Sequence, residues 1–116
     1  MRQSPGMPLP PAGKVASLEQ ARIQRALRER VRYRYVQPQV LREGSGWRVR
    51  SPCCSRNVDP AGGPIDVAWL QRLPQGGWRL HARDHARSEW RRHNEAAQLA
   101  ELLDTLCLDP QRIFWP

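Results

Sequence analysis

The sequence lacks any long apolar run, and it contains little cysteine. No stretch of about eighteen apolar residues occurs, so we expect no contact with a membrane. The N-terminus also lacks the apolar core of a secretory signal, which favours a cytoplasmic protein. The three cysteines, Cys53, Cys54 and Cys107, are an odd number with two adjacent. This excludes a disulfide framework and fits a reducing compartment.

The short motifs that mark common active sites are also missing. The sequence contains no G-x-S-x-G, no G-x-x-x-x-G-K-[ST] and no G-x-G-x-x-G. Asp84-His85 is more typical of a turn than of a catalytic dyad, and a Cys54–His81 pair would need a spatial contact. We therefore expect a domain that is not an enzyme. The alternative left open is a small enzyme that uses the loop 51–64.

Metal-ligand spacing is absent as well. Structural zinc sites favour two cysteines separated by two residues, whereas Cys53 and Cys54 are adjacent. His81 and His85 are four apart, which brings side chains together on a helix but not across a strand and a turn. We expect no bound metal and no other cofactor.

The chain is rich in arginine, proline and glycine. Its 116 residues suffice for one domain, and eleven prolines and eight glycines argue against a helical bundle. The net charge of +8 comes almost wholly from arginine, because Lys14 is the only lysine. Such a charge fits an anionic partner, either a nucleic acid or an acidic protein.

Apolar and charged residues alternate with a period of two between Ile65 and His93. This pattern predicts antiparallel strands with one wet face. Turns are expected at 74–77, which contains a proline and two glycines, and at 84–87. The alternation predicts that Trp69, Trp78 and Trp90 share one face and form a core, with a ligand-stacking platform as the alternative.

The first half of the chain is predicted to contain a tail, a helix and two strands. Residues 1–16 are rich in proline and glycine and are expected to be disordered. Ser17 and Gln20 form a capping-box pattern that opens a helix. Strands are expected at 31–41, interrupted by a proline, and around Trp47. A long polar loop over 51–64 follows, and we expect it to be mobile.

The C-terminal region is predicted to be a helix followed by an apolar plug. Asn94 is the expected N-cap, and Asp109-Pro110 ends the helix, because the residue before proline avoids the helical region. Ile113-Phe114-Trp115 is too apolar to stay in water and is expected to fill one end of the core. The resulting element order predicts a single α+β domain over 17–116, an antiparallel β-meander of about five strands flanked by an N-terminal and a C-terminal helix.

Residues 65–115 also carry a set of local motifs. They are Val67-Ala68-Trp69, Trp78-Arg79-Leu80, Trp90-Arg91-Arg92-His93 and Asp109-Pro110-Gln111-Arg112-Ile113-Phe114-Trp115. These resemble domain-of-unknown-function family 3024, which occurs in small bacterial proteins, although the chain ends in Pro116 where that family tends to have glycine. The resemblance implies a fold and a bacterial origin, and it implies no activity.

Arginines fall opposite the apolar residues of the expected strands. If these strands share one sheet, its polar face gathers Arg32, Arg34, Arg48, Arg50, Arg79, Arg83 and Arg91. Guanidinium groups bind phosphate oxygens in a bidentate manner, so this face is a candidate site for nucleic acid or another anion. The alternative is a solvated face on which Asp66, Asp84 or Glu89 pairs with the arginines.

We predict that protein purified without chelator contains far less than one zinc per chain, because the cysteine spacing does not suit a structural site. Elemental analysis by mass spectrometry checks this prediction. One tightly held equivalent, whose removal unfolds the domain, would contradict it.

Overall fold

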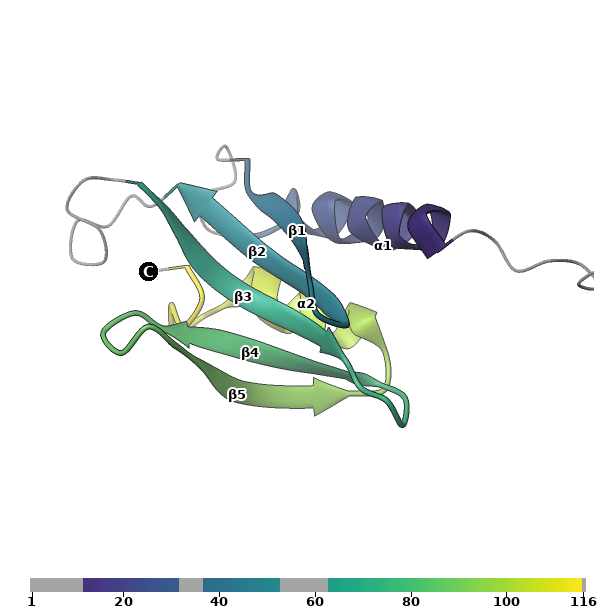
Figure 1. Ribbon diagram of the computed structural model, residues 1–116. Helices are drawn as coiled ribbons and strands as arrows, with labels where there is room; N and C mark the ends of the chain where they lie inside the picture. The colour runs from purple at the N-terminus through teal and green to yellow at the C-terminus, as the bar shows by residue number, and fades with distance from the viewer. Residues whose placement is uncertain (1–11, 32–36, 53–62, 116) are drawn as a thin grey trace, which may run out of the picture.

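Five strands form one antiparallel sheet, and a helix lies at each end of the chain (Figure 1). The computed structural model describes residues 12–31, 37–52 and 63–115, with side chains from residue 18 onward. The elements are α1 (Ala12–Leu27), β1 (Gln39–Glu43), β2 (Gly46–Pro52), β3 (Pro64–Arg72), β4 (Trp78–Asp84), β5 (Glu89–Ala96) and α2 (Leu99–Leu108). Each strand pairs with its sequence neighbours, in the order β1-β2-β3-β4-β5. This confirms the α+β fold class.

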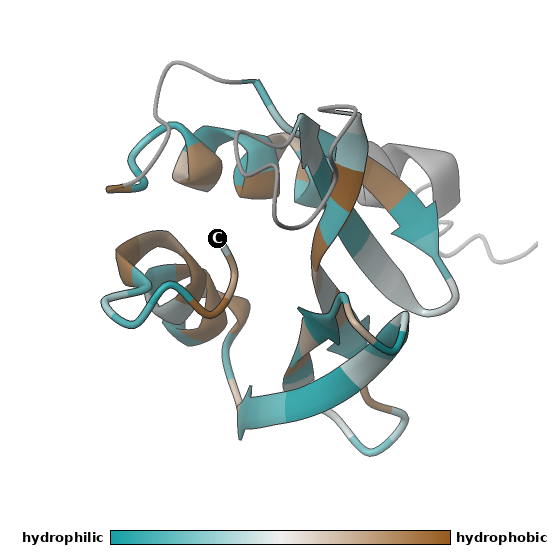
Figure 2. Ribbon diagram, turned by 90° about the vertical axis from the view of Figure 1, so that its left-hand side faces the viewer, coloured by the Kyte–Doolittle hydropathy of each residue, from teal (hydrophilic) through white to brown (hydrophobic). Residues whose placement is uncertain are grey.

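Both helices pack on the same face of the sheet, as Figure 2 shows from the side. α1 contacts β1, α2 contacts β4 and β5, and the two helices contact each other. The core between the helices and the sheet consists of Ile23, Leu27, Val40, Trp47, Val49, Val67, Ala68, Leu70, Trp78, Leu80, Ala82, Leu99, Leu102, Leu103, Leu106, Phe114 and Trp115. No helix within the described ranges is long and apolar enough to cross a membrane.

Glycine permits the tight hairpin between β1 and β2. Gly44 has a φ of +56°, a left-handed backbone conformation that residues other than glycine rarely adopt. A Cβ atom on Gly46 would lie 1.8 Å from the carbonyl oxygen of Leu70, so only glycine lets β2 approach β3 this closely. These two glycines therefore permit both the turn and the close packing of β2 against β3.

The first helix begins earlier than the capping-box pattern predicts. α1 starts at Ala12, so Ser17 lies inside the helix and does not cap it. The prediction of a disordered tail is therefore wrong for residues 12–16, which are helical. Residues 1–11 lie outside the described residues. Ala12, Lys14, Val15 and Ala16 continue the helix without proline, which the sequence reading overlooked.

Two polar side chains of α1 bind it to the sheet. The carboxylate of Glu19 accepts a hydrogen bond from Trp47 Nε1 at 3.0 Å and pairs with Arg72. The side chain of Gln20 donates to the carbonyl of Val40 at 2.7 Å, on the edge strand β1. Polar side chains therefore set the position of α1 over β1 and β2.

The connections around the sheet differ from expectation in two places. The strand expected from residue 31 lies largely outside the described residues, and β1 follows Pro38. The loop 51–64 is shorter at both ends, because Ser51 pairs with Ile65 and Pro52 with Pro64; its interior, with Cys53 and Cys54, is outside the described residues.

The last helix also starts later than predicted. Asn94 does not cap it, because β5 continues to Ala96 and pairs Asn94 with Leu80. α2 starts at Leu99, and its N-cap Gln98 makes no side-chain capping bond. Pairing with β4 thus extends the strand through a residue whose local preference favours a cap.

Two β-bulges interrupt the alternation of the sheet. Val49 pairs with Ala68 and Arg50 pairs with Asp66, so Val67 has no partner in β2. In the same way, Leu80 pairs with Asn94 and His81 with Arg92, which leaves His93 unpaired in β5. A bulge inserts one residue into one strand, so side chains on either side of it exchange faces relative to a strict period of two.

A buried carboxylate organises the C-terminus. Asp109, which is 2% exposed, ends α2 with a left-handed φ of 35°. Its side chain accepts hydrogen bonds from the backbone N–H groups of Ile113 at 2.7 Å, Phe114 at 3.1 Å and Trp115 at 2.8 Å. The Asp-Pro-x-x-Ile-Phe-Trp motif is therefore a turn folded around one aspartate.

The turn inserts its two aromatic residues into the core and joins the two helices. Phe114 and Trp115 are buried, which confirms the expected plug for them, whereas Ile113 is 37% exposed and does not belong to it. Trp115 Nε1 donates to the carbonyl of Leu106 at 2.9 Å. The guanidinium of buried Arg30, just after α1, lies 4.5 Å from the centre of the Trp115 ring. We call this arrangement the C-terminal junction.

We predict that Asp109→Asn lowers the free energy of unfolding by about 2–4 kcal/mol, because hydrogen bonds to a charged acceptor contribute more than neutral ones. Asparagine tolerates the left-handed backbone, so the substitution isolates the carboxylate. Chemical denaturation measures the change. The control is Asp104→Asn, at an exposed position of α2, with an expected change within about 0.5 kcal/mol. Equal stabilities for the two variants would show that the junction does not depend on the carboxylate.

Candidate functional site

One face of the sheet carries no helix among the described elements. Cross-strand pairs share a face, so the pairings of Arg48 with Trp69, and of Trp69 with His81, place these residues opposite the core. We call this surface the open face. Its residues are Leu41, Glu43, Arg48, Arg50, Asp66, Trp69, Gln71, Arg79, His81, Arg83, Trp90, Arg92 and Glu95.

The three tryptophans do not share a face, so the predicted common core is wrong. Trp78 is 6% exposed and belongs to the core. Trp69 and Trp90 instead lie on the open face and are only half-buried. The reason is the bulge at Val67, which puts both Val67 and Ala68 on the core side and sends Trp69 to the other face. The alternative, a ligand-stacking platform, stays a prediction for Trp69 and Trp90.

Four of the expected arginines gather on the open face. They are Arg48 and Arg50 of β2 and Arg79 and Arg83 of β4, the two strands on either side of β3. Arg32 and Arg34 lie outside the described residues.

Arg91 is a correction to the predicted set. It pairs with Ala82, a core residue, and its side chain binds Asp84 at 2.7 Å, so it leaves the sheet on the helix side. Arg92 takes its place, since it pairs with His81 on the open face. The period-two pattern did not indicate Arg92, because with Trp90 expected on the apolar side, Arg92 two positions later would face that side too.

A single carboxylate organises three of the arginines. Asp66 Oδ1 lies 3.1 Å from Arg48 Nη1 and 3.4 Å from Arg50 Nε, and Oδ2 lies 3.9 Å from Arg83 Nε. The Asp66 side chain is 18% exposed, so these pairs are only partly screened by water. Asp66 therefore neutralises one charge and holds three guanidinium groups around it, in agreement with the pairing that the sequence left as an alternative.

The open face nevertheless keeps a positive surplus. Arg79 pairs with Glu95 at 2.7 Å, and Arg48 also approaches Glu43 at 3.5 Å. No carboxylate in the described ranges lies within ion-pair distance of Arg92. Five arginines face three carboxylates, which leaves two positive charges in excess.

Aromatic rings occupy the middle of this charged surface. The Trp69 ring stacks on His81, with centroids 4.5 Å apart and an angle of 23° between the planes. Trp90 lies 6.2 Å from Trp69 at 46°, and the guanidinium of Arg83 lies 4.9 Å from the centre of the Trp90 ring. His81 Nε2 lies 2.9 Å from the side-chain oxygen Oε1 of Gln71, and because that oxygen only accepts, Nε2 donates its proton.

Burial and positive charge favour the neutral form of His81 on the open face and of His85 in the turn after β4. Burial lowers the pKa of His81 below its ordinary value, Arg79 and Arg92 lower it further, and Glu95 opposes them. Burial also lowers the pKa of His85, as does Arg83, against the opposing charges of Asp66 and Asp84. The positive charge of the face at neutral pH is therefore arginine charge alone.

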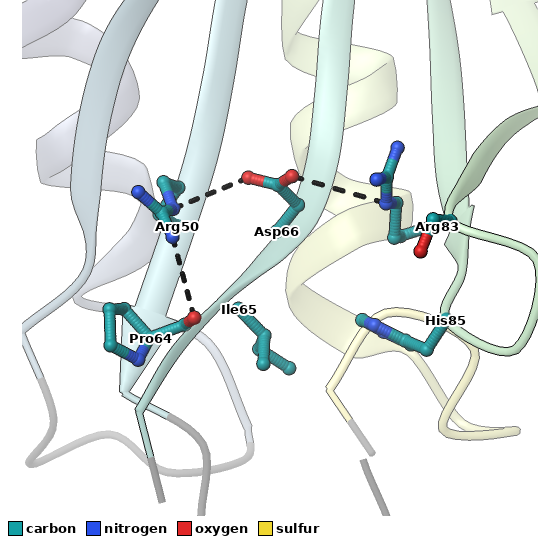
Figure 3. A pocket seen from close by; sticks show the side chains of 7 residues that line it. Arg50, Pro64, Ile65, Asp66, Arg83 and His85 are labelled. Carbon is teal, nitrogen blue, oxygen red and sulfur yellow. Dashed lines mark hydrogen bonds and ion pairs between the residues drawn. The ribbon is translucent and has the colours of Figure 1, made fainter. Parts of the chain in front are cut away.

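A hollow of about 250 Å³ lies at one end of the open face (Figure 3). It is lined by Arg50, Pro64, Ile65, Asp66, Arg83, His85 and Ser88. In Figure 3, Asp66 lies between Arg50 and Arg83, and Arg50 Nη2 also donates to the carbonyl of Pro64 at 3.4 Å. Each guanidinium has five donors, and the contacts with Asp66 and Pro64 occupy two donors of Arg50 and one of Arg83.

The metal and nucleophile candidates remain apart or undescribed. No group of three or more His, Cys, Asp and Glu residues in the described part of the chain is arranged to hold a metal ion. Cys53 and Cys54 lie outside that part. Cys107 is half-buried against Ala26, whose carbonyl accepts its S–H at 3.3 Å, and burial raises the pKa of its thiol to about 11. A thiol with this pKa stays protonated and is a poor nucleophile at neutral pH.

These features define a class of protein: a small α+β domain in which two helices cover one face of an antiparallel meander and the other face carries arginine and tryptophan. The chain belongs to the DUF3024 family, a domain of unknown function, whose sequence pattern matches residues 10–116. The resemblance noted over 65–115 thus extends to nearly the whole chain. No curated protein and no solved structure matches it.

We predict that the free energy of unfolding falls as the pH decreases from 7.5 to 5.5. The unfolded state binds protons at a histidine pKa of about 6.5, whereas the folded state keeps His81 and His85 neutral to lower pH, so stability rises with pH across this range. His81→Gln should reduce the slope. Urea titrations at several pH values measure it, with exposed His93→Gln as the control. A wild-type slope of zero would contradict the prediction.

Proposed function

We propose that this domain is a non-enzymatic binding module whose open face binds nucleic acid. The observation that carries the proposal is the combination of five arginines, two half-exposed tryptophans and a histidine on a sheet face that no described helix covers. Arginine forks match phosphate oxygens, and aromatic rings stack on bases. The helices lie on the opposite face and leave this surface accessible.

The electrostatics of the open face favour a polyanion over a small acidic ligand. The positive surplus is spread over β2, β4 and β5 and is not concentrated in one closed pocket. Asp66 restrains the three arginines around it, so less side-chain entropy is lost when a phosphate binds. A chain of phosphates can contact several such cations at once, whereas a single anion contacts one or two.

Binding is favoured over catalysis by the chemistry of the same side chains. Arginine cannot exchange a proton near neutral pH, and each open-face carboxylate lies within ion-pair distance of an arginine. We further propose a cytoplasmic, bacterial setting. The odd number of cysteines and the free thiol of Cys107 support a reducing compartment, and the family resemblance supports the origin.

We predict that single-stranded oligothymidylate of roughly twelve nucleotides binds with a salt slope of about −3 to −4 in a log–log plot, since each neutralised phosphate contributes about 0.7. Replacing Arg48, Arg50, Arg79 and Arg83 by glutamine should lower the affinity at least tenfold. The same change should bring the magnitude of the salt slope below about 1. Fluorescence anisotropy of the labelled oligonucleotide measures both quantities.

The matched control removes the same charge from elsewhere. Exposed Arg22 and Arg25 of α1, exposed Arg28 just after it and exposed Arg91 of β5 are replaced by glutamine. This variant should retain most of the affinity. A double variant, Arg50→Gln with Arg83→Gln, leaves Arg48 beside Asp66 and covers the case in which the quadruple variant does not fold. Wild-type binding weaker than about 1 mM at low salt, or equal losses in both quadruple variants, would refute the proposal.

A further inference from the structure

We propose that the open face prefers single strands to duplexes, with bases stacked on Trp69 and Trp90 and phosphates held beside them by Arg83 and Arg92. This inference rests on the proposed function. It adds the strandedness of the ligand, and it assigns bases and phosphates to different side chains.

The geometry of the two tryptophans does not fit a duplex. Bases in a double helix stack about 3.4 Å apart along each strand. The Trp69 and Trp90 ring centroids are 6.2 Å apart, and their planes are inclined by 46°. Two bases stacked on these rings are therefore splayed from each other, which is the arrangement in which proteins bind unpaired nucleotides.

The accessible parts of the rings suit stacking. The indole N–H of Trp69 is already used, because it donates to the carbonyl of Glu43 at 3.2 Å. His81 covers one side of Trp69 at 4.5 Å and stiffens it, since His81 is itself 8% exposed and bonded to Gln71. A ligand can therefore contact Trp69 only through the uncovered surface of its ring, and an aromatic ring stacks with any base. Binding should therefore depend little on sequence.

Cations flank the rings at the positions where a backbone would pass. The Arg83 guanidinium lies over one face of the Trp90 ring, 4.9 Å from its centre, and also lines the hollow beside Arg50, so a base would stack on the other face. The hollow has room for a phosphate group, with a volume of about 250 Å³. On the other side of Trp90 along β5, Arg92 is paired with His81 and is exposed. One phosphate beside each arginine would leave the intervening base next to Trp90.

The open face has no element that would enter a duplex groove. Reading a B-form major groove takes an α-helix or a two-stranded ribbon that protrudes into it. Both described helices pack on the opposite face, and the arginine-bearing side of α1 is directed away from the sheet. A sheet surface is suited instead to a strand laid across it, with bases toward the rings.

The test compares labelled single-stranded oligothymidylate of roughly twelve nucleotides with a mixed-sequence duplex of the same length, at equal low salt. We expect at least tenfold tighter binding of the single strand. Quenching of tryptophan fluorescence on titration with unlabelled oligonucleotide should accompany it, because stacking reaches the half-exposed indoles. Poly-glutamate serves as a polyanion without bases, and it should compete far less well at equal charge.

Substitutions at Trp90 separate stacking from charge. Trp90→Leu should weaken single-strand binding roughly tenfold and leave the salt slope unchanged, because it removes a base contact and no phosphate contact. Trp90→Phe should restore most of the affinity, which a purely structural role of the ring would not require. Trp90 is on the edge strand β5 and half-buried, and circular dichroism checks that both variants fold.

The outcomes distinguish this inference from the proposed function. Equal affinity for single strand and duplex, or a Trp90→Leu variant that binds as the wild type does, overturns the inference, while a loss in the open-face arginine variant still supports nucleic-acid binding. Competition by poly-glutamate equal to that of the oligonucleotide overturns the stacking assignment and identifies a general polyanion surface. Absence of binding to either nucleic acid overturns both.

Discussion

The carboxylate of Asp109 is the interaction on which the closure of this domain depends. It accepts hydrogen bonds from three successive backbone N–H groups, two of them at buried residues, and so it reverses the chain at the end of α2. The reversal delivers Phe114 and Trp115 to the core and places Trp115 beneath Arg30. The N-terminal and C-terminal halves meet there, since the Val31 N–H also bonds to the carbonyl of Cys107 at 3.0 Å.

The two bulges have a comparable effect on the sheet. With strict alternation from Ile65 and no bulge at Val67, Trp69 would face the core, and the open face would lose its central ring. With the bulge, Val67, Ala68 and Leu70 are all buried and Trp69 emerges beside His81. Trp90 and Arg92 share that face by simple alternation, and the second bulge, at His93, returns Glu95 to it opposite Arg79. His93 itself contacts Phe114, at a centroid distance of 5.0 Å. The two bulges therefore shape both the hydrophobic core and the open face.

Asp66 determines the character of the open face. A cluster of arginines without a carboxylate would repel itself and spread into solvent. Around Asp66, three guanidinium groups from β2 and β4 converge, and the face retains a positive surplus because Arg92 adds a charge without a paired carboxylate in the described ranges. Such a surface combines order with attraction for anions, whereas a uniformly paired face would have order alone.

The sequence by itself determined the fold class, the turns rich in glycine and proline, and the arginine content of the strands, because these follow from local chemistry and a period-two pattern. It also marked the C-terminal motif, although not the reason for it. The tertiary structure alone decided that Trp69 and Trp90 leave the core, that Arg92 replaces Arg91 on the open face, and that Asn94 remains in a strand. Each depends on register between strands, and one bulged residue reverses the face of every residue beyond it, which no local propensity records.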